Sequence, residues 1–255
     1  MTIDFTNKNV LITGGSRGIG RACAKLFSAL NANVIITYKN NLAKAEQTIK
    51  SLTSNGKHSF FQLDIAQPDA IKNMFSEVMQ KYERLDVLVN NAGVFIEHKI
   101  SEVSYEEWQQ AWNETISTNL TGVSNLCYFA AKQMMAQQYG KIVNISSRGA
   151  FRGEPEHPAY GASKAGLNAM SQSLAVALAP HNITVGIIAP GFVETDMAAA
   201  YINSELGDQV KKQSPFNRVA KPEEVANLVA VFASDGLEFT TGGIVDVNGA
   251  SYLRS

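Results

Sequence analysis

Tyr160 and Lys164 are the residues whose types and spacing most directly suggest chemistry, because they stand four positions apart in a stretch that predicts a helix. Side chains with this spacing lie on one helix face and can reach the same ligand. An ammonium beside a phenol favours the phenolate, so we expect Lys164 to lower the pKa of Tyr160 from its ordinary value of about 10. Such a tyrosine can exchange a proton with a substrate oxygen. Taken alone, the pair is more often a packed tyrosine and a solvated lysine, so its meaning depends on neighbouring motifs.

A glycine-rich segment, residues 13–20, could bind a diphosphate. It joins an apolar β-rich run to residues at helical spacing, where unpaired backbone N–H groups and the positive end of a helix can meet an anion. Glycines at 14, 18 and 20 allow the backbone to approach such a ligand closely. The same glycines could also form a purely structural turn, so the strand and helix on either side carry the interpretation.

The elements that must position these residues are short apolar runs alternating with stretches of helical period. This alternation predicts a single-domain, Rossmann-like α/β fold, doubly wound, with a seven-stranded parallel sheet and helices on both faces. The first helix should end near Asn31 and present an apolar face made of Ile19, Cys23, Leu26, Phe27 and Leu30. The expected strands are residues 10–13, 33–38, 59–63, 87–90, 141–146, 184–189 and 244–247.

Ligands of open α/β sheets bind at the carboxyl ends of the strands, so the residues that follow each strand are the informative ones. We find no linker or repeat that divides residues 1–255, and we expect one NAD(P)-binding domain. The irregular stretch 192–215 is long for a plain connector, and we expect it to be a substrate lid.

Composition excludes several classes of protein. A net charge of −1 gives no driving force for binding nucleic acid. The sequence shows no secretory leader and no apolar run long enough to span a membrane, so we expect a cytoplasmic protein. Cys23 and Cys127 are expected to be buried thiols, and no metal site is expected because the histidines form no ligand spacing: His58, His98, His157 and His181.

The glycine pattern G-x-x-x-G-x-G at residues 14–20 resembles that of the short-chain dehydrogenase/reductase family. The resemblance covers nearly the whole chain, through the segments Asn90-Asn91-Ala92-Gly93, Asn119, Ser146-Ser147, Tyr160-Gly161-Ala162-Ser163-Lys164 and Pro190-Gly191. It implies an NAD(P)(H)-dependent oxidoreductase that interconverts a carbonyl and an alcohol.

The resemblance also assigns roles to the catalytic residues. Tyr160 would be the acid/base, and Ser147 would hold the substrate carbonyl, with Ser146 as the adjacent alternative. Lys164 would also hydrogen-bond the nicotinamide ribose. Asn119 would hold a water that passes protons towards Lys164 and Tyr160; without the resemblance it would be an ordinary solvated helix residue.

The cofactor site implied by the resemblance draws on every strand end. Asp64 would contact the adenine, although it could instead cap a helix. Asn90, Ala92 and Gly93 would wall the adenosine side and steady the central strands, and Thr195 would bind the carboxamide. The full expected set is Gly14, Ser16, Arg17, Gly18, Ile19, Gly20, Tyr38, Lys39, Asp64, Ile65, Asn90, Ala92, Gly93, Tyr160, Lys164, Pro190, Gly191, Val193 and Thr195.

The end of the second expected strand indicates which cofactor is used. An acid there would favour NAD(H), but the position is Tyr38, followed by Lys39. With Arg17 in the glycine turn, two cations could meet the 2′-phosphate of NADP(H). We therefore expect NADP(H) to be preferred and NAD(H) to be possible, unless both cations are simply solvated.

Within the family, residues 144–166 and 215–225 most resemble the 3-oxoacyl-[acyl-carrier-protein] reductases of fatty acid biosynthesis. This resemblance implies an acyl-thioester substrate and a homotetramer formed through the helices bearing Asn119 and Tyr160 and through the last strand. An acidic carrier protein would need a basic entrance. Gln137, Gln138, Glu154 and Glu156 do not supply one, although Arg148 and Arg152 partly offset them.

Two alternatives remain open. The substrate could be a sugar, polyol, steroid or other small ketone, with a pocket set by Phe192, Met197, Tyr201 and Phe216. A protein of another class, a non-catalytic nicotinamide sensor, would be favoured by the loss of Tyr160 or Lys164, and both are present. The chain departs from its relatives at Asn248-Gly249-Ala250, where an acid and two glycines are common.

Overall fold

A parallel sheet forms the centre of the computed structural model, which describes residues 3–53, 56–202, 204–205 and 207–254. Within these residues the sheet has seven strands in the order β3-β2-β1-β4-β5-β6-β7, and every neighbouring pair is parallel. Each expected strand is present with its ends shifted by at most one residue. The strands are β1 (Asn9–Ile12), β2 (Asn33–Tyr38), β3 (Ser59–Gln62), β4 (Val87–Asn90), β5 (Gly140–Ile145), β6 (Ile183–Pro190) and β7 (Ile244–Val247).

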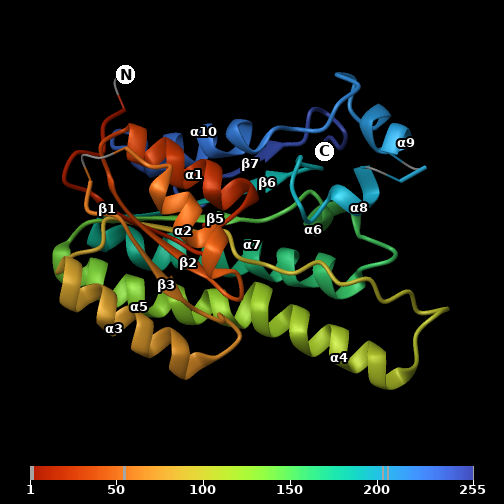
Figure 1. Cartoon of the computed structure of the whole chain (residues 1–255), viewed down its shortest axis with the longest axis horizontal. Helices are drawn as coiled ribbons and strands as arrows, with labels where there is room; N and C mark the ends of the chain where they lie inside the picture. Colours follow the sequence, from red (N-terminus) through yellow and green to blue (C-terminus); the bar gives the residue numbers. More distant parts are fainter. Residues whose placement is uncertain (1–2, 54–55, 203, 206, 255) are drawn as a thin grey trace.

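Helices cover both faces of this sheet (Figure 1). One face carries α1 (Gly18–Ala29), α2 (Leu42–Lys50) and α10 (Pro222–Ala233). The other carries α3 (Pro68–Tyr82), α4 (Tyr105–Ile116), α5 (Gly122–Gln137) and α7 (Pro158–Leu178). Three short helices gather at one end of the molecule: α6 (Gly149–Arg152), α8 (Ala199–Ile202) and α9 (Gly207–Lys212). The doubly wound Rossmann-like fold expected from the sequence is confirmed.

Two apolar cores lie on opposite faces of the sheet, because successive side chains of a strand point to opposite sides. Val10 and Ile12 of β1 join the core under α1 and α10, whereas Leu11 joins the core under α3, α5 and α7. Cys23 and Cys127 are free, buried thiols, one in each core. Burial on both faces explains why the strands are nearly continuous apolar runs.

The first helix ends close to the predicted position. Its last residue is Ala29, and Asn31 follows with a left-handed φ of 69°, a conformation that asparagine tolerates better than most residues. Cys23 and Phe27 are fully buried on its apolar face, as expected. Within the described part of the chain, no helix combines the length and apolar character needed to cross a membrane.

The order of the strands reverses direction between β1 and β4. The chain runs outward from β1 to β3 and then returns to place β4 on the other side of β1. In open α/β sheets, this reversal separates the loops above the strand ends and leaves a crevice where ligands bind. The chain after β6, with α8 and α9, lies at the end of the molecule that also holds α6 (Figure 1).

Candidate active site

A cavity of about 620 Å³ lies where the first six strands end. It brings together nearly all the residues singled out in the sequence, which are far apart along the chain. The predicted residues that line it are Gly14, Ser16, Arg17, Gly18, Ile19, Tyr38, Lys39, Asp64, Ile65, Ala92, Gly93, Ser147, Tyr160, Lys164, Pro190, Gly191, Phe192, Val193 and Thr195. Gly20, Asn90 and Asn119 do not line it and lie behind its wall.

Tyr160, Lys164 and Ser147 meet at one end of the cavity. Tyr160 and Lys164 are one turn apart in α7, and the Lys164 ammonium lies 5.7 Å from the centre of the Tyr160 ring. Ser147 follows β5, and its hydroxyl approaches the Tyr160 phenol closely enough to favour the ionised form of that group. Its Oγ accepts a hydrogen bond from the backbone of Gly149 at 3.0 Å. The proximity to Tyr160 favours Ser147 over Ser146, whose Oγ is buried without a partner among the described residues.

Asn119 supports this end of the cavity from behind. It lies in a π-helical turn, Ser117–Thr121, between α4 and α5, and π-helical turns often occur at functional sites. Its Oδ1 accepts from the Val94 N–H at 2.8 Å, and its Nδ2 donates to the Val94 carbonyl at 2.9 Å. The amide thereby fixes the loop after β4. The expected water-holding role of Asn119 stays a prediction.

The turn between β1 and α1 can accommodate a diphosphate. Gly14 and Gly18 have φ values of +65° and +52°, which residues with a side chain rarely adopt. A Cβ at Gly20 would run into the carbonyl oxygen of Gly14, so the helix can approach the turn this closely only with glycine. Asn91, to which the sequence analysis gave no role of its own, donates to the carbonyl of Thr13 at 2.9 Å and joins this turn to the end of β4.

Comparisons with known proteins agree with this geometry. A family model described as enoyl-(acyl carrier protein) reductase matches residues 14–250. A 3-oxoacyl-[acyl-carrier-protein] reductase of Staphylococcus epidermidis is 37% identical over 248 residues, which are 97% of this chain and 100% of the relative. The chain belongs to the short-chain dehydrogenase/reductase family.

Other relatives support the same family. The 3-oxoacyl-[acyl-carrier-protein] reductase of Aquifex aeolicus is 35% identical over 253 residues, which are 99% of this chain and 100% of the relative. A crystal structure described as gox2181 has a TM-score of 0.89 at 30% identity, covering 97% of this chain and 96% of that one. The protein is thus an NAD(P)-dependent oxidoreductase that acts on CH–OH groups.

Burial has the largest effect on the pKa values of Tyr160 and Lys164. It raises the pKa of Tyr160 to about 12, although the nearby Ser147 hydroxyl acts in the opposite direction. It also lowers the pKa of Lys164 to about 8. The prediction that Lys164 lowers the pKa of Tyr160 is wrong for this arrangement. The ammonium donates a hydrogen bond to the Ile145 carbonyl at 2.8 Å, and burial, not the lysine charge, has the largest effect on the phenol.

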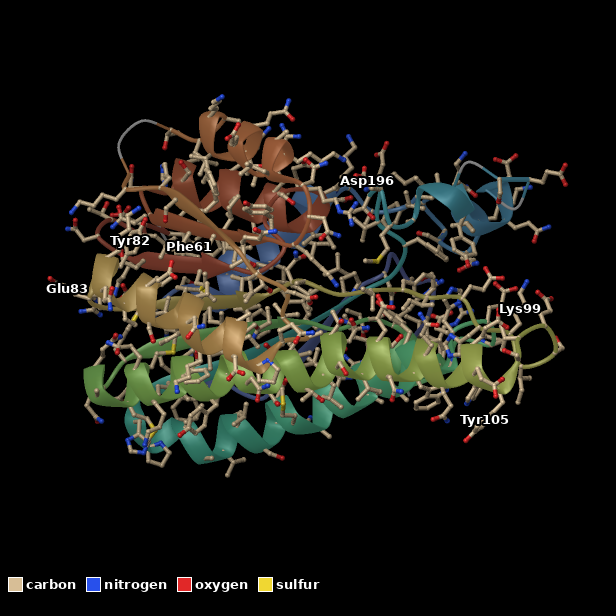
Figure 2. The ribbon with its side chains drawn as sticks, turned by 60° about the horizontal axis from the view of Figure 1, so that its bottom comes forward. Phe61, Tyr82, Glu83, Lys99, Tyr105 and Asp196 are labelled. Carbon is tan, nitrogen blue, oxygen red and sulfur yellow. The ribbon has the colours of Figure 1, made fainter. Side chains whose placement is uncertain are left out.

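The other end of the cavity is rich in paired charges. Lys39 pairs with Asp64 at 2.9 Å, so the cation and acid expected to contact different parts of the cofactor contact each other. Asp196 pairs with Lys44 at 2.7 Å and lies 3.7 Å from Arg17. Figure 2 shows Asp196 between the α1–α2 layer and the segment that carries α8 and α9. All of these pairs are exposed enough to exchange partners with a ligand.

The residues expected to form the substrate pocket line two different cavities. Phe192, Met197 and Tyr201 line the main cavity as expected, but Phe216 does not and is largely exposed beside a smaller pocket. The Tyr201 hydroxyl donates to Glu97 at 3.2 Å and thereby joins α8 to the loop after β4.

Two residues near Tyr160 escaped the sequence analysis of the reactive end. The ring of Phe95 meets that of Tyr160 edge-on at 4.7 Å. Glu154 lines the cavity, and burial raises its pKa. Only their positions in the sequence could have indicated them. Phe95 stands four positions after Asn91, and Glu154 stands six positions before Tyr160.

Asn90 lies inside the sheet and not on the wall of the cavity. Its Nδ2 donates to Asn144 Oδ1 at 2.8 Å, which ties β4 to β5. The expectation that it walls the adenosine side is therefore corrected: Ala92 and Gly93 line the cavity, and Asn90 supports the strands that carry them. A buried asparagine in a strand is stable only with such a partner.

Proposed function

We propose that the protein uses NADPH to reduce the 3-oxo group of an acyl thioester, carried on acyl-carrier protein, to a hydroxyl group. The observation that carries this proposal is the convergence of Ser147 and Tyr160 in a cavity of about 620 Å³ at the strand ends, with Lys164 one helix turn from Tyr160. The names of the curated relatives support the thioester as the substrate.

In this reaction the chain's own residues hold the ketone and supply the proton, while the bound nicotinamide supplies the hydride. Ser147 and Tyr160 donate hydrogen bonds to the carbonyl oxygen and stabilise the charge that develops there. Because the pKa of Tyr160 is about 12, its hydroxyl keeps its proton until the oxygen becomes strongly basic and takes it. Lys164 and Asn119 would then restore that proton through a bound water.

A panel of substrates tests the reaction. NADPH oxidation should occur with 3-oxoacyl-[acyl-carrier-protein] and be weak with cyclohexanone, a hexulose or an enoyl thioester. The enoyl thioester tests the description of the matching family model. Activity on only one of the other compounds would show that the enzyme reduces a different ketone, or the carbon–carbon double bond of the enoyl thioester. Cofactor binding without turnover on any of them would favour a nicotinamide sensor.

Tyr160→Phe separates catalysis from binding. Loss of the hydroxyl should reduce kcat by at least a thousandfold, since the proton donor and one hydrogen bond to the oxygen are both removed. NADPH binding, measured by fluorescence titration, should change little. A variant that turned over at a near-normal rate would refute the role of Tyr160.

The preference for NADPH rests on Lys39 and Arg17, which line the end of the cavity opposite the reactive pair. Both are largely exposed, so they can exchange their present partners, Asp64 and Asp196, for a 2′-phosphate. Lys39→Glu should raise the KM for NADPH about tenfold or more and leave that for NADH within about twofold. Equal effects on both cofactors would contradict this preference.

The remaining features of the proposal concern the whole protein. Residues 192–215 would close over the substrate, since Phe192 and Tyr201 line the reactive part of the cavity. The enzyme would be a cytoplasmic homotetramer assembled through α5, α7 and β7. Apolar side chains exposed on these elements, including Tyr128 and Val176, support that arrangement.

A further inference from the structure

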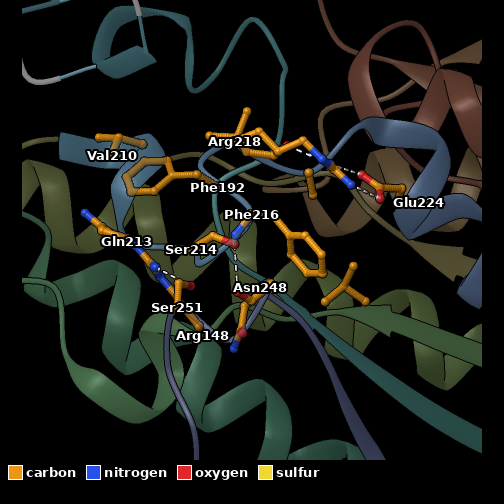
Figure 3. Close-up of a pocket in the computed structure, with 14 residues that line it drawn as sticks. Arg148, Phe192, Val210, Gln213, Ser214, Phe216, Arg218, Glu224, Asn248 and Ser251 are labelled. Carbon is orange, nitrogen blue, oxygen red and sulfur yellow. Dashed lines mark hydrogen bonds and ion pairs between the residues drawn. The ribbon is translucent and has the colours of Figure 1, made fainter. Parts of the chain in front are cut away.

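Arg148 directly follows Ser147 and lies between two spaces. The residue lines the main cavity, and its side chain borders a smaller pocket of about 90 Å³, which Phe192 also borders (Figure 3). The residue is only 3% exposed, and its guanidinium lies 5.0 Å from the centre of the Phe192 ring. The expectation that Arg148 contributes to a basic entrance is therefore wrong, because this cation is inside the protein.

The side chains that hold Arg148 are neutral. Nη1 donates to Ser251 Oγ and Nη2 donates to Gln213 Oε1, both at 2.6 Å (Figure 3). Among residues 3–53, 56–202, 204–205 and 207–254, no carboxylate forms an ion pair with it. Glu154 and Arg152 influence it only at longer range. The positive charge is thus buried without a counter-charge in direct contact.

Lys141 shows how this chain holds a cation that has only a structural role. It is as deeply buried as Arg148, but its ammonium contacts Glu238 at 2.9 Å and Asp235 at 3.6 Å. In the part of the chain that the structure describes, the other buried cation without a carboxylate partner is Lys164, which lines the cavity. Burial of an unpaired charge is strongly unfavourable, so a ligand that supplies the missing charge is a physical reason for this arrangement.

Arg148 keeps donors that an anion can use. A guanidinium has five N–H donors, and Ser251 and Gln213 use one on each terminal nitrogen. Nε–H and one N–H on each terminal nitrogen remain, and charge-assisted hydrogen bonds from such donors bind a carboxylate. Glu154 lines the same cavity, where burial raises its pKa and the charges of Arg152 and Arg148 lower it.

We propose that Arg148 binds a carboxylate carried by a ketone, so that the enzyme also reduces free oxo acids and prefers them to neutral ketones of the same size. The inference rests on the proposed ketone reduction and goes beyond the acyl thioester, whose own carboxyl group is bonded to sulfur and carries no charge. Arg148 would bind the acid, while the adjacent Ser147 holds the reacting carbonyl. The two residues follow β5, which ends at the reactive site.

Matched pairs of substrates test this selection. The probes are 2-, 3- and 4-oxopentanoate and their methyl esters, which place the charge at three distances from the carbonyl. At least one acid should exceed its ester in kcat/KM by about tenfold to a hundredfold, the range expected for a charge-assisted bidentate bond. In Arg148→Met this ratio should fall to about one. In the control Arg152→Met, which removes an exposed cation four residues away, the ratio should remain.

A purely structural role would make Arg148 only a connection between Gln213 after α9 and Ser251 near the carboxyl end. Gln213→Glu distinguishes the two roles because it supplies a carboxylate from within the chain. If Arg148 binds substrate, this variant should lose activity on the acid selectively and keep that on the ester, with an unchanged or higher unfolding temperature. Equal activity of wild type, Arg148→Met and Gln213→Glu on the preferred acid would overturn the inference.

The two proposals fail in different ways. Turnover of the thioester with an acid-to-ester ratio near one in wild type would overturn the role of Arg148 and leave ketone reduction intact. If no ketone oxidises NADPH, the reductase proposal fails, and calorimetric titration with pentanoate decides the role of Arg148. Binding to wild type but not to Arg148→Met would support it, and equal binding would overturn it.

Discussion

Tyr160 and Lys164 show what residue spacing can and cannot predict. Their i, i+4 spacing correctly placed both on the cavity, because it depends only on helix geometry. Their pKa values depend on burial, and the orientation of Lys164 depends on a carbonyl in β5, nineteen positions away. The sequence pattern contains neither quantity, so the direction predicted for the pKa of Tyr160 was wrong.

Lys164→Met should change how the free energy of unfolding depends on pH. The folded-state pKa of Lys164 is about 8, below its ordinary value of 10.5, so the unfolded chain binds more protons between these pH values. Stability from this group therefore rises with pH, by roughly 1 kcal/mol from pH 7 to pH 9. The raised pKa of Tyr160 changes the free energy of unfolding only above pH 10, the ordinary pKa of tyrosine. It therefore does not contribute between pH 7 and pH 9.

Urea unfolding at pH 7, 8 and 9 measures this difference. Wild type should gain stability relative to Lys164→Met across the series, because the variant lacks the titrating group. Parallel pH dependences for the two proteins would contradict the lowered pKa of Lys164.

At the scale of elements, strands were more predictable than the connection between α4 and α5. Buried parallel strands are apolar runs with clear ends, so their positions could be predicted within one residue. The π-helical turn at Ser117–Thr121 follows from a tertiary contact, in which Asn119 reaches both Val94 and Ser163. No local pattern in an otherwise helical stretch indicates such a contact.

Gly20→Ala should damage the packing of α1 against the β1 turn. The new Cβ would collide with the Gly14 carbonyl and approach Asn91 Nδ2 to 2.6 Å, and neither group is free to move. We expect a loss of roughly 1–3 kcal/mol in the free energy of unfolding and clearly weaker NADPH binding. Urea unfolding and fluorescence titration measure the two effects.

Gly166→Ala in α7 is the matched control, because its Cβ would meet only the end of the Leu120 side chain, at 3.0 Å. Alanine also favours a helix over glycine by about 1 kcal/mol, so this variant should be as stable as wild type or more so. Equal stability and equal NADPH binding in Gly20→Ala and wild type would show that the turn tolerates a side chain.

At the scale of the whole molecule, the sequence predicted that the site lies at the strand ends. It did not predict the contacts between side chains across the site. Strand order and the rule for parallel sheets were enough to gather most expected residues around one cavity. The pairing of Lys39 with Asp64, the burial of Arg148 and the separation of Phe216 from the cavity depend on how loops pack. Such packing joins segments more than a hundred residues apart and has no periodic signal.

Assembly is the largest-scale feature left to measure, and Val176→Asp tests it. Val176 on α7 is 79% exposed and Tyr128 on α5 is 61% exposed, which leaves apolar side chains uncovered on the two helices proposed to join subunits. Light scattering should give a wild-type mass of four times 27.6 kDa. A carboxylate at position 176 would be buried without a partner, so the variant should dissociate into smaller species.

Ile100→Asp is the control: it changes a residue that is 80% exposed in the loop before α4 and should keep the tetramer mass. If Val176→Asp also kept that mass, α7 would not be a subunit interface.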